Sequence, residues 1–268
     1  MDTLPHGSVD VVQVAYVVEQ LERLRAPFAA VGLGLGIASQ ADPAARPAGP
    51  GEATAAVGMI PRRGREFLAG RLAARRALRA VGLECGDIPR AGRLPVFPPG
   101  RAASITHSAG VAVSVALAPG RTGAPGCDLE LRELPPAAAR LVLREDEEAW
   151  LHAAGPVLAR DRLLALFSAK EAAWKALYGT PAHPVPGMGA SGARVPGPPG
   201  TLRDLRAVPT PDGFVVRVRA GAESGGTDGR GVAGHGADVP GTDARGAGRG
   251  VEVRVRTVAG GVFSWVCL

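Results

Sequence analysis

Two carboxylates in the middle of the chain, Asp128 and Glu130, have types and spacing that could do chemistry. They alternate with apolar residues in the segment 126–131, and this alternation predicts a β-strand. Side chains two residues apart on a strand point to the same side, so the two carboxylates would repel each other unless a cation joined them. Oxygen ligands of this kind suit a hard cation such as Mg²⁺, which bridges substrate phosphates. The chain has no Cys/His spacing that would favour Zn²⁺ instead.

A second stretch, residues 167–175, holds both lysines of the chain, Lys170 and Lys175, on either side of Glu171. The lysine ammonium is a compact point charge, whereas the arginine guanidinium is planar and spreads its charge. Two lysines placed here in a chain that otherwise uses arginine suggest a site that needs an ammonium. Residues 157–178 lack Gly and Pro and are predicted to form a helix. On that helix Lys170 falls within the apolar stripe, so its ammonium must either meet an anion or extend along the surface to reach water. Glu171 and Lys175 lie together on the flank of the stripe, where they could be an ordinary ion pair four residues apart.

Together the two stretches suggest phosphoryl chemistry, in which positioning and electrostatics do most of the catalysis. Without a ligand the two lysines would neutralise the carboxylates. If a metal ion and a diphosphate were bound, each of the three acids and two lysines would have a partner of opposite charge. His107, on a predicted turn 107–110 before a strand at 111–117, could donate to a phosphate; an ordinary turn histidine is the alternative.

The elements that would position these groups can be predicted from the pattern of apolar and charged residues. Residues 61–79 read as a basic amphipathic helix with seven arginines against one acid, which is either a solvated face or a phosphate contact. A helix is predicted over 135–154, with an acidic cluster at 145–148 interpreted as a solvated face or partner contact. Strands are predicted at 104–106, 213–219, 251–258 and 261–268, and loops at 41–51 and 179–200. Residues 8–37 fit strand or helix equally.

Composition bounds the function classes. The chain has 268 residues, 46% hydrophobic, and a net charge of +6, which favours an acidic partner such as a phosphate, nucleic acid or acidic protein. The excess of Ala, Gly, Arg and Pro is interpreted as composition bias, and the glycine-rich segment 221–250 as a flexible insertion. Three cysteines without metal or disulfide spacing favour a reducing compartment. Without a signal-peptide pattern or a long apolar run, a cytoplasmic protein is expected.

Residues 126–130 followed by 167–175 resemble the signature of 4′-phosphopantetheinyl transferases, in the form of the branch that contains enterobactin synthase component D and the surfactin-type enzymes. Residues 104–108 resemble the segment of that branch before its first metal motif, and residues 63–71 resemble its N-terminal arginine helix. The resemblance runs from about residue 62 to residue 175, in the order and approximate spacing of the family.

The resemblance implies transfer of the phosphopantetheine arm of coenzyme A to a serine of an acidic acyl or peptidyl carrier protein, with release of adenosine 3′,5′-bisphosphate. Glu171, or a water on the metal, would help to deprotonate the serine, while Lys175, supported by Lys170, would neutralise the diphosphate. The residues implied are Asp128, Glu130 and Glu171 for Mg²⁺; Glu171, Lys175 and Lys170 for catalysis; and Arg65, Arg71, Arg93, Thr106, His107 and Lys175 for coenzyme A.

The fold implied is α+β, with two similar α/β halves related by a pseudo-twofold axis. The N-terminal half would be 1–125 and the C-terminal half 126–268, with coenzyme A between them in a monomer that binds neither nucleic acid nor membranes. Three alternatives stay open: another Mg²⁺-dependent phosphotransferase or nuclease, a non-catalytic basic protein that binds an acidic partner, and a degenerate transferase that binds coenzyme A without transferring.

Overall fold

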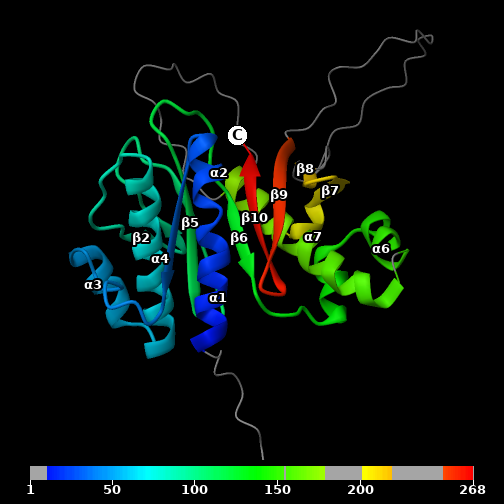
Figure 1. Ribbon diagram of the computed structural model, residues 1–268, viewed down its shortest axis with the longest axis horizontal. Helices are drawn as coiled ribbons and strands as arrows, with labels where there is room; N and C mark the ends of the chain where they lie inside the picture. Colours follow the sequence, from blue (N-terminus) through cyan, green and yellow to red (C-terminus); the bar gives the residue numbers. More distant parts are fainter. Residues whose placement is uncertain (1–10, 154, 179–200, 219–249, 268) are drawn as a thin grey trace, which may run out of the picture.

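A computed structural model describes residues 11–153, 155–178, 201–218 and 250–267 of the chain (Figure 1). The fold is of the α+β class, as predicted. Helices are α1 (Val11–Glu22), α2 (Arg25–Ala30), α3 (Pro50–Val57), α4 (Pro61–Ala80), α5 (Ala139–Val142), α6 (Glu145–His152) and α7 (Gly155–Tyr178), with 3₁₀ turns at Pro136–Ala138 and Leu202–Asp204. Strands are β1 (Leu33–Ser39), β2 (Arg90–Ala91), β3 (Leu94–Pro95), β4 (Ala103–Ser108), β5 (Val111–Leu117), β6 (Cys127–Glu130), β7 (Leu205–Thr210), β8 (Gly213–Val218), β9 (Gly250–Val258) and β10 (Gly261–Cys267).

The described strands pair in antiparallel fashion throughout. A three-stranded sheet has the order β1-β5-β4, a five-stranded sheet has the order β6-β10-β9-β8-β7, and β2 with β3 makes a short ribbon. The two larger sheets meet where β4 lies beside β6, so the strand that carries Asp128 and Glu130 is at the junction.

Side-chain hydroxyls on β4 take the place of backbone carbonyls at this junction. Alternate residues of β4 each accept a hydrogen bond from a backbone N–H on β6 or just beyond its end. The pairs are Ser104 with Cys127 at 3.1 Å, Thr106 with Leu129 at 3.2 Å and Ser108 with Leu131 at 3.1 Å. Because alternate strand side chains share one side, a serine or threonine at every second position can serve a neighbouring strand in this way. We call this set the hydroxyl ladder.

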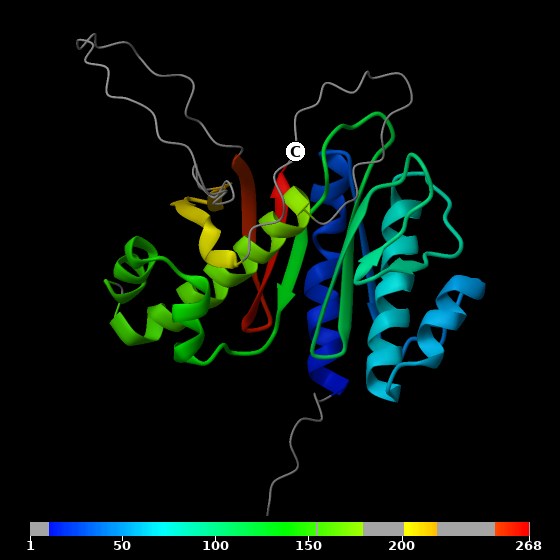
Figure 2. The same ribbon diagram turned by 180° about the vertical axis from the view of Figure 1, so that it is seen from behind.

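Each sheet has one face in a shared core and another face under a long helix. The shared core joins apolar residues of both sheets to α1 and α2, and its aromatic centre is Phe28 with Phe263 and Trp265. The opposite faces carry α4 on the first sheet and α7 on the second (Figure 2). Cys127 and Leu129 are fully buried in the shared core, so Asp128 and Glu130 point to the face on which the two long helices lie.

Glycine lets both long helices approach their sheets closely. A Cβ added to Gly36 on β1 would lie 1.9 Å from the Ala73 carbonyl oxygen of α4, and one on Gly126 would lie 2.0 Å from the Ala172 carbonyl oxygen of α7. No side chain other than hydrogen fits at such a distance from backbone. Gly126 immediately precedes β6, so this contact sets the separation between β6 and the helix that carries Lys175.

Most of the predicted elements are confirmed. The helices predicted over 157–178 and 61–79 correspond to α7 and α4, and the strands at 126–131, 213–219, 251–258 and 261–268 correspond to β6, β8, β9 and β10 within two residues, over the described part of the chain. Of residues 8–37, which fitted strand or helix, the described part from residue 11 onward forms α1, α2 and most of β1. The short strand β7 had no counterpart among the predicted elements.

Three local predictions were wrong. His107 lies on β4 opposite Ala112 and not on the turn, because Ala109 and Gly110, both with positive φ, make the turn by themselves. The helix predicted over 135–154 is broken where Leu143 and Arg144 are extended. Part of the loop predicted over 41–51 already belongs to α3, which begins at Pro50.

Some predictions are not tested by this fold. Each sheet carries one long helix, but the pseudo-twofold axis and the division into 1–125 and 126–268 stay predictions. The loop at 179–200 and nearly all of the insertion at 221–250 lie outside the described residues. Within the described residues, no helix is long and apolar enough to cross a membrane.

Gly126→Ala should lower the free energy of unfolding by about 3 kcal/mol, because the new methyl group collides with the backbone of α7. Gly64→Ala on α4 is the control: nothing lies within 4 Å of its added Cβ, so it should be neutral or stabilising by up to about 1 kcal/mol. Urea unfolding monitored by circular dichroism measures both. Equal stability of the two variants would contradict the close contact.

Candidate active site

The most buried acid of the predicted site, Asp128, is contacted from both sides of the sheet junction. Its side chain is 5% exposed, and its Oδ1 accepts hydrogen bonds from Thr106 Oγ1 at 3.1 Å and Lys175 Nζ at 2.7 Å. Its Oδ2 is buried and has no hydrogen-bond partner among the residues that the structure describes. A buried carboxylate oxygen without a donor is costly, and a bound cation is one way to satisfy it.

Lys175 comes from the last turns of α7, one helical turn after Glu171. Its Nζ also donates to the Cys127 carbonyl oxygen at 3.1 Å, so both of these contacts are with β6. Burial works to lower the pKa of Lys175, but Asp128, Cys127 and Glu171 outweigh it and leave that pKa raised. Lys175 is therefore a fixed cation in a group of acids.

Glu130 and Glu171 complete this group. Burial, reinforced by the charge of Asp128 and opposed by Lys175, raises the pKa of Glu130 to about 7. Burial also raises the pKa of Glu171, with Lys175 acting against it and Asp128 in support. Mutual influence of this kind means that the three carboxylates lie within each other's electrostatic reach. Strongly perturbed acids gathered in one place are typical of functional sites.

The donor set fits a hard divalent cation. Asp128 and Glu130 share one face of β6, Glu171 reaches the group from α7, and the unpartnered Asp128 Oδ2 is available as a ligand. Among the described residues, no three His, Cys, Asp or Glu side chains already have the arrangement of a metal site. Lys175 holds the other Asp128 oxygen, so the carboxylates have a positive charge beside them without an ion.

A cavity of about 470 Å³ lies between α4, the β2–β3 ribbon and β4. Its wall includes predicted coenzyme A contacts, Arg71, Arg93 and His107, and also Arg63, Glu66 and Arg90, which were not predicted. His107 is the residue of the cavity wall within electrostatic reach of the acid group, because the charge of Lys175 helps to lower its pKa. Arginine walls of this kind suit a phosphorylated ligand.

Arg71 is held in one orientation inside this cavity. It is buried, its Nε donates to the Ile88 carbonyl oxygen at 2.7 Å, and its guanidinium lies 4.4 Å from the centre of the Phe67 ring. Burial lowers the pKa of Arg71 to about 10, which still leaves it charged at neutral pH. The other guanidinium nitrogens of Arg71 are therefore held in a fixed planar arrangement inside the cavity.

His107 is arranged as a neutral imidazole. Burial lowers its pKa, Glu66 works against this and Arg63 adds to it. Arg63 Nη1 lies 3.1 Å from His107 Nε2, so that nitrogen accepts from the guanidinium and Nδ1 carries the proton.

Two predicted contacts lie elsewhere. Arg65 is exposed and does not line the cavity; its neighbour Arg63 does. Thr106 uses its hydroxyl hydrogen on Asp128 and its lone pairs on the hydroxyl ladder, so it supports the acid rather than facing the cavity. The spacing of arginines on α4 could have indicated Arg63, which lies two turns before Arg71 on the helix.

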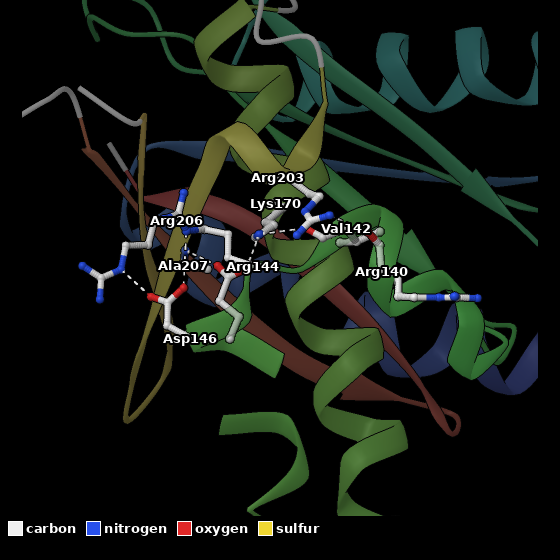
Figure 3. A network of polar contacts seen from close by, with 9 residues as sticks. Arg140, Val142, Arg144, Asp146, Lys170, Arg203, Arg206 and Ala207 are labelled. Atoms are coloured by element: carbon white, nitrogen blue, oxygen red, sulfur yellow. Dashed lines mark hydrogen bonds and ion pairs between the residues drawn. The ribbon is translucent and has the colours of Figure 1, made fainter. Parts of the chain in front are cut away.

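Lys170 is also not brought to the acid group. It is fully buried and donates to Glu147 Oε2 at 2.5 Å and to the Val142 carbonyl oxygen at 2.9 Å, within the network drawn in Figure 3. Burial lowers the pKa of Lys170, and Glu147 works against it. Lys170 therefore does find the anion that its position on the apolar stripe requires, but on the side of α7 that faces α5 and α6.

Glu147 belongs to the acidic cluster at 145–148 that was interpreted as a solvated face or partner contact. It is 4% exposed, so that interpretation is wrong for this residue. Sequence reasoning missed it because one continuous helix over 135–154 does not turn Glu147 inward. A lysine on an apolar stripe was the available signal that a buried acid had to be nearby.

Two family models match consecutive parts of the chain. The 4'-phosphopantetheinyl transferase N-terminal domain matches residues 52–117, and the 4'-phosphopantetheinyl transferase superfamily matches residues 124–188. Over these two segments the chain is similar to the 4′-phosphopantetheinyl transferase family. The matched segments contain all the site residues that were predicted.

A curated relative from the same family is similar over part of its length. The 4'-phosphopantetheinyl transferase Svp of Streptomyces mobaraensis is 34% identical over 134 residues, which are 48% of this chain and 54% of that protein. The chain thus spans about half the length of the curated relative that it matches.

Thr106→Val should lower the free energy of unfolding by about 1–3 kcal/mol, because Leu129 N–H loses its buried acceptor and Asp128 loses a donor. Thr106→Ser keeps the hydroxyl and serves as the matched control, with a smaller loss. Urea unfolding of the three proteins measures the difference. Valine and serine variants of the same stability would show that the hydroxyl contributes nothing at the junction.

Proposed function

We propose that this chain transfers the 4′-phosphopantetheine arm of coenzyme A to a serine of an acyl or peptidyl carrier protein, releasing adenosine 3′,5′-bisphosphate. The match of two segments to models of the family supports the reaction class, and the basic charge of the chain suits an acidic carrier. The order of its motifs favours the branch of enterobactin synthase component D and the surfactin-type enzymes.

One observation carries the proposal: His107 lines an arginine-walled cavity of about 470 Å³ and lies within electrostatic reach of Lys175, which is paired with the buried Asp128. Arg71 and Arg93 would bind the 3′-phosphate of coenzyme A at one part of the wall. His107 would donate to the diphosphate through Nδ1–H, near Lys175. The reacting phosphorus would then lie next to Glu171.

Each residue of the acid group has a separate role in this arrangement. Lys175 would neutralise the diphosphate and stabilise the departing phosphate, since its ammonium is already oriented by Asp128 and the Cys127 carbonyl. Glu171, or a water on the metal, would accept the proton of the carrier serine. Thr106 would hold Asp128 in place.

Asp128, Glu130 and Glu171 would hold Mg²⁺, which neutralises charge on the diphosphate when bound. The unpartnered Asp128 Oδ2 supports this assignment. Lys170, which contacts Glu147 and not the acid group, has no direct part in the proposed reaction.

Incubation of the chain with an apo carrier protein, coenzyme A and Mg²⁺ should add the mass of one phosphopantetheine group to the carrier, as read by mass spectrometry. EDTA should abolish the gain and added Mg²⁺ restore it. Asp128→Asn keeps an acceptor for Thr106 but loses charge, so its rate should fall about a hundredfold or more.

Transfer at the same rate with EDTA or with Asp128→Asn would contradict the proposed metal site. Binding of coenzyme A without transfer to carriers of fatty-acid, polyketide and peptide synthesis would favour a degenerate binder. No binding at all would remove the proposal. Circular dichroism of Asp128→Asn checks that the variant is folded.

Arg71→Lys should weaken coenzyme A binding about tenfold or more, because a lysine cannot reproduce the fork that faces the 3′-phosphate. Binding of 3′-dephospho-coenzyme A should stay within about twofold, since it lacks that group. Isothermal titration measures both ligands. Arg79→Lys, an exposed arginine paired with Glu84 near the other end of α4, is the control and should bind as wild type.

Equal weakening for the two ligands would place the contact of Arg71 elsewhere on coenzyme A.

A further inference from the structure

A buried ion pair lies on the side of α7 away from the acid group. Glu147 accepts three hydrogen bonds: Oε2 from Lys170 Nζ at 2.5 Å and Arg144 N–H at 2.9 Å, and Oε1 from Ala207 N–H at 2.7 Å. These donors come from α7, from the residue before α6, and from β7. Glu147 therefore ties three elements of the C-terminal sheet region together at one carboxylate, in the network of Figure 3.

The surface of α7 that packs on its sheet has the large Leu163 and Leu166 in its first half, but small side chains beside Lys170 and Glu171. Ser168, Ala169, Ala172 and Ala173 are all fully buried. Small side chains allow close approach, as the contact at Gly126 shows, but they interlock weakly. Packing along this stretch sets how near α7 lies to β6 more firmly than it sets the rotation of α7 about its own axis.

Helix geometry couples that rotation to the acid group. Glu171 follows Lys170 directly and is about 100° from it around the helix, and Lys175 is about 40° from Glu171 on the same side. When Lys170 points to Glu147, Glu171 and Lys175 must point to Asp128. A small roll of α7 would move both residues away from β6 together.

Stability does not by itself account for the pair. A buried ion pair usually adds little net stability compared with apolar residues of similar size, because desolvation offsets the attraction. An ammonium that donates hydrogen bonds to two acceptors is, however, restricted to one orientation. Lys170 Nζ has such a second partner in the Val142 carbonyl, at 2.9 Å.

We propose that Glu147 and Lys170 are positioning residues that fix the rotation of α7 and thereby hold Lys175 against Asp128 and Glu171 in the acid group. The geometric part concerns the fold alone; the effect on transfer rests on the proposed function. Neither side chain touches a reacting group.

The test variant is Lys170→Met with Glu147→Gln, which removes both charges and keeps an acceptor for Ala207 N–H. Its turnover with carrier protein should fall by tenfold to about a hundredfold, since a displacement of about 1 Å can cost that much. Turnover should fall more than KM for coenzyme A rises, because Arg71 on α4, His107 on β4 and Arg93 between β2 and β3 stay in place while Lys175 moves. Lys170→Met alone should also reduce turnover. Lys170→Arg should reduce it as well, because a guanidinium cannot take the place of the ammonium between Glu147 and Val142.

Loss of stability must be separated from loss of position. Leu78→Ala, a fully buried residue of α4 in a different core cluster, is the control and is compared at a temperature where both variants are folded. Leu78→Ala should keep wild-type turnover. Wild-type turnover in the double variant, or the same loss in Leu78→Ala, would overturn the proposal.

A second readout needs no transfer. The coupling between Lys175 and Asp128 is measured by a double-mutant cycle with Lys175→Met and Asp128→Asn in urea unfolding. The coupling should be present in the wild-type background and lost in the background of the double variant. Coupling that is retained in the double variant would overturn the positioning role. If the coupling is lost but the wild-type chain transfers to no carrier, the proposed function is refuted and the positioning role stands.

Discussion

The carboxylate of Asp128 is buried, and a buried carboxylate must be met by donors or cations. Thr106 meets it from the first sheet, and Lys175 meets it from the helix that packs on the second sheet. Both contacts use one oxygen, so the other oxygen is left to a further partner. The junction of the two sheets and the candidate reaction centre are consequently the same place. The hydroxyl ladder and the glycine contact at α7 both serve to keep Asp128 within reach of its partners.

Distance and rotation of α7 are set by different features. Gly126 allows the helix to lie close to β6, and no other residue would fit against the Ala172 carbonyl. The Glu147–Lys170 pair holds the opposite side of the helix. A chain rich in Ala and Gly can therefore hold the Lys175 ammonium in a narrowly defined position. Small side chains permit the close approach of α7 to β6, and the buried Glu147–Lys170 pair fixes the rotation of the helix. The excess of small residues, interpreted as composition bias, has a structural use at these contacts.

Local periodicity was enough to predict the strand and the helix that carry the site. Alternation put Asp128 and Glu130 on one side of β6, and the absence of Gly and Pro defined α7. The partner of Lys170 could not be predicted in the same way, because Glu147 lies 23 residues earlier and turns inward only where the chain breaks at Leu143 and Arg144. His107 was assigned to a turn because positive φ at Ala109, a residue other than glycine, has no clear sequence signal. The cavity depends on long-range packing of α4 against β4, so only the spacing of Arg63 from Arg71 on the helix was available in the sequence to favour Arg63 over Arg65.

The most direct test is a crystal structure of the full chain with coenzyme A and Mg²⁺. The expected result is the 3′-phosphate at Arg71, the diphosphate between His107 and Lys175, and the metal ion bound to Asp128 with Glu130 or Glu171. Coenzyme A bound outside the cavity, or an ion that does not touch Asp128, would contradict the assignment of the sheet junction as the reaction centre.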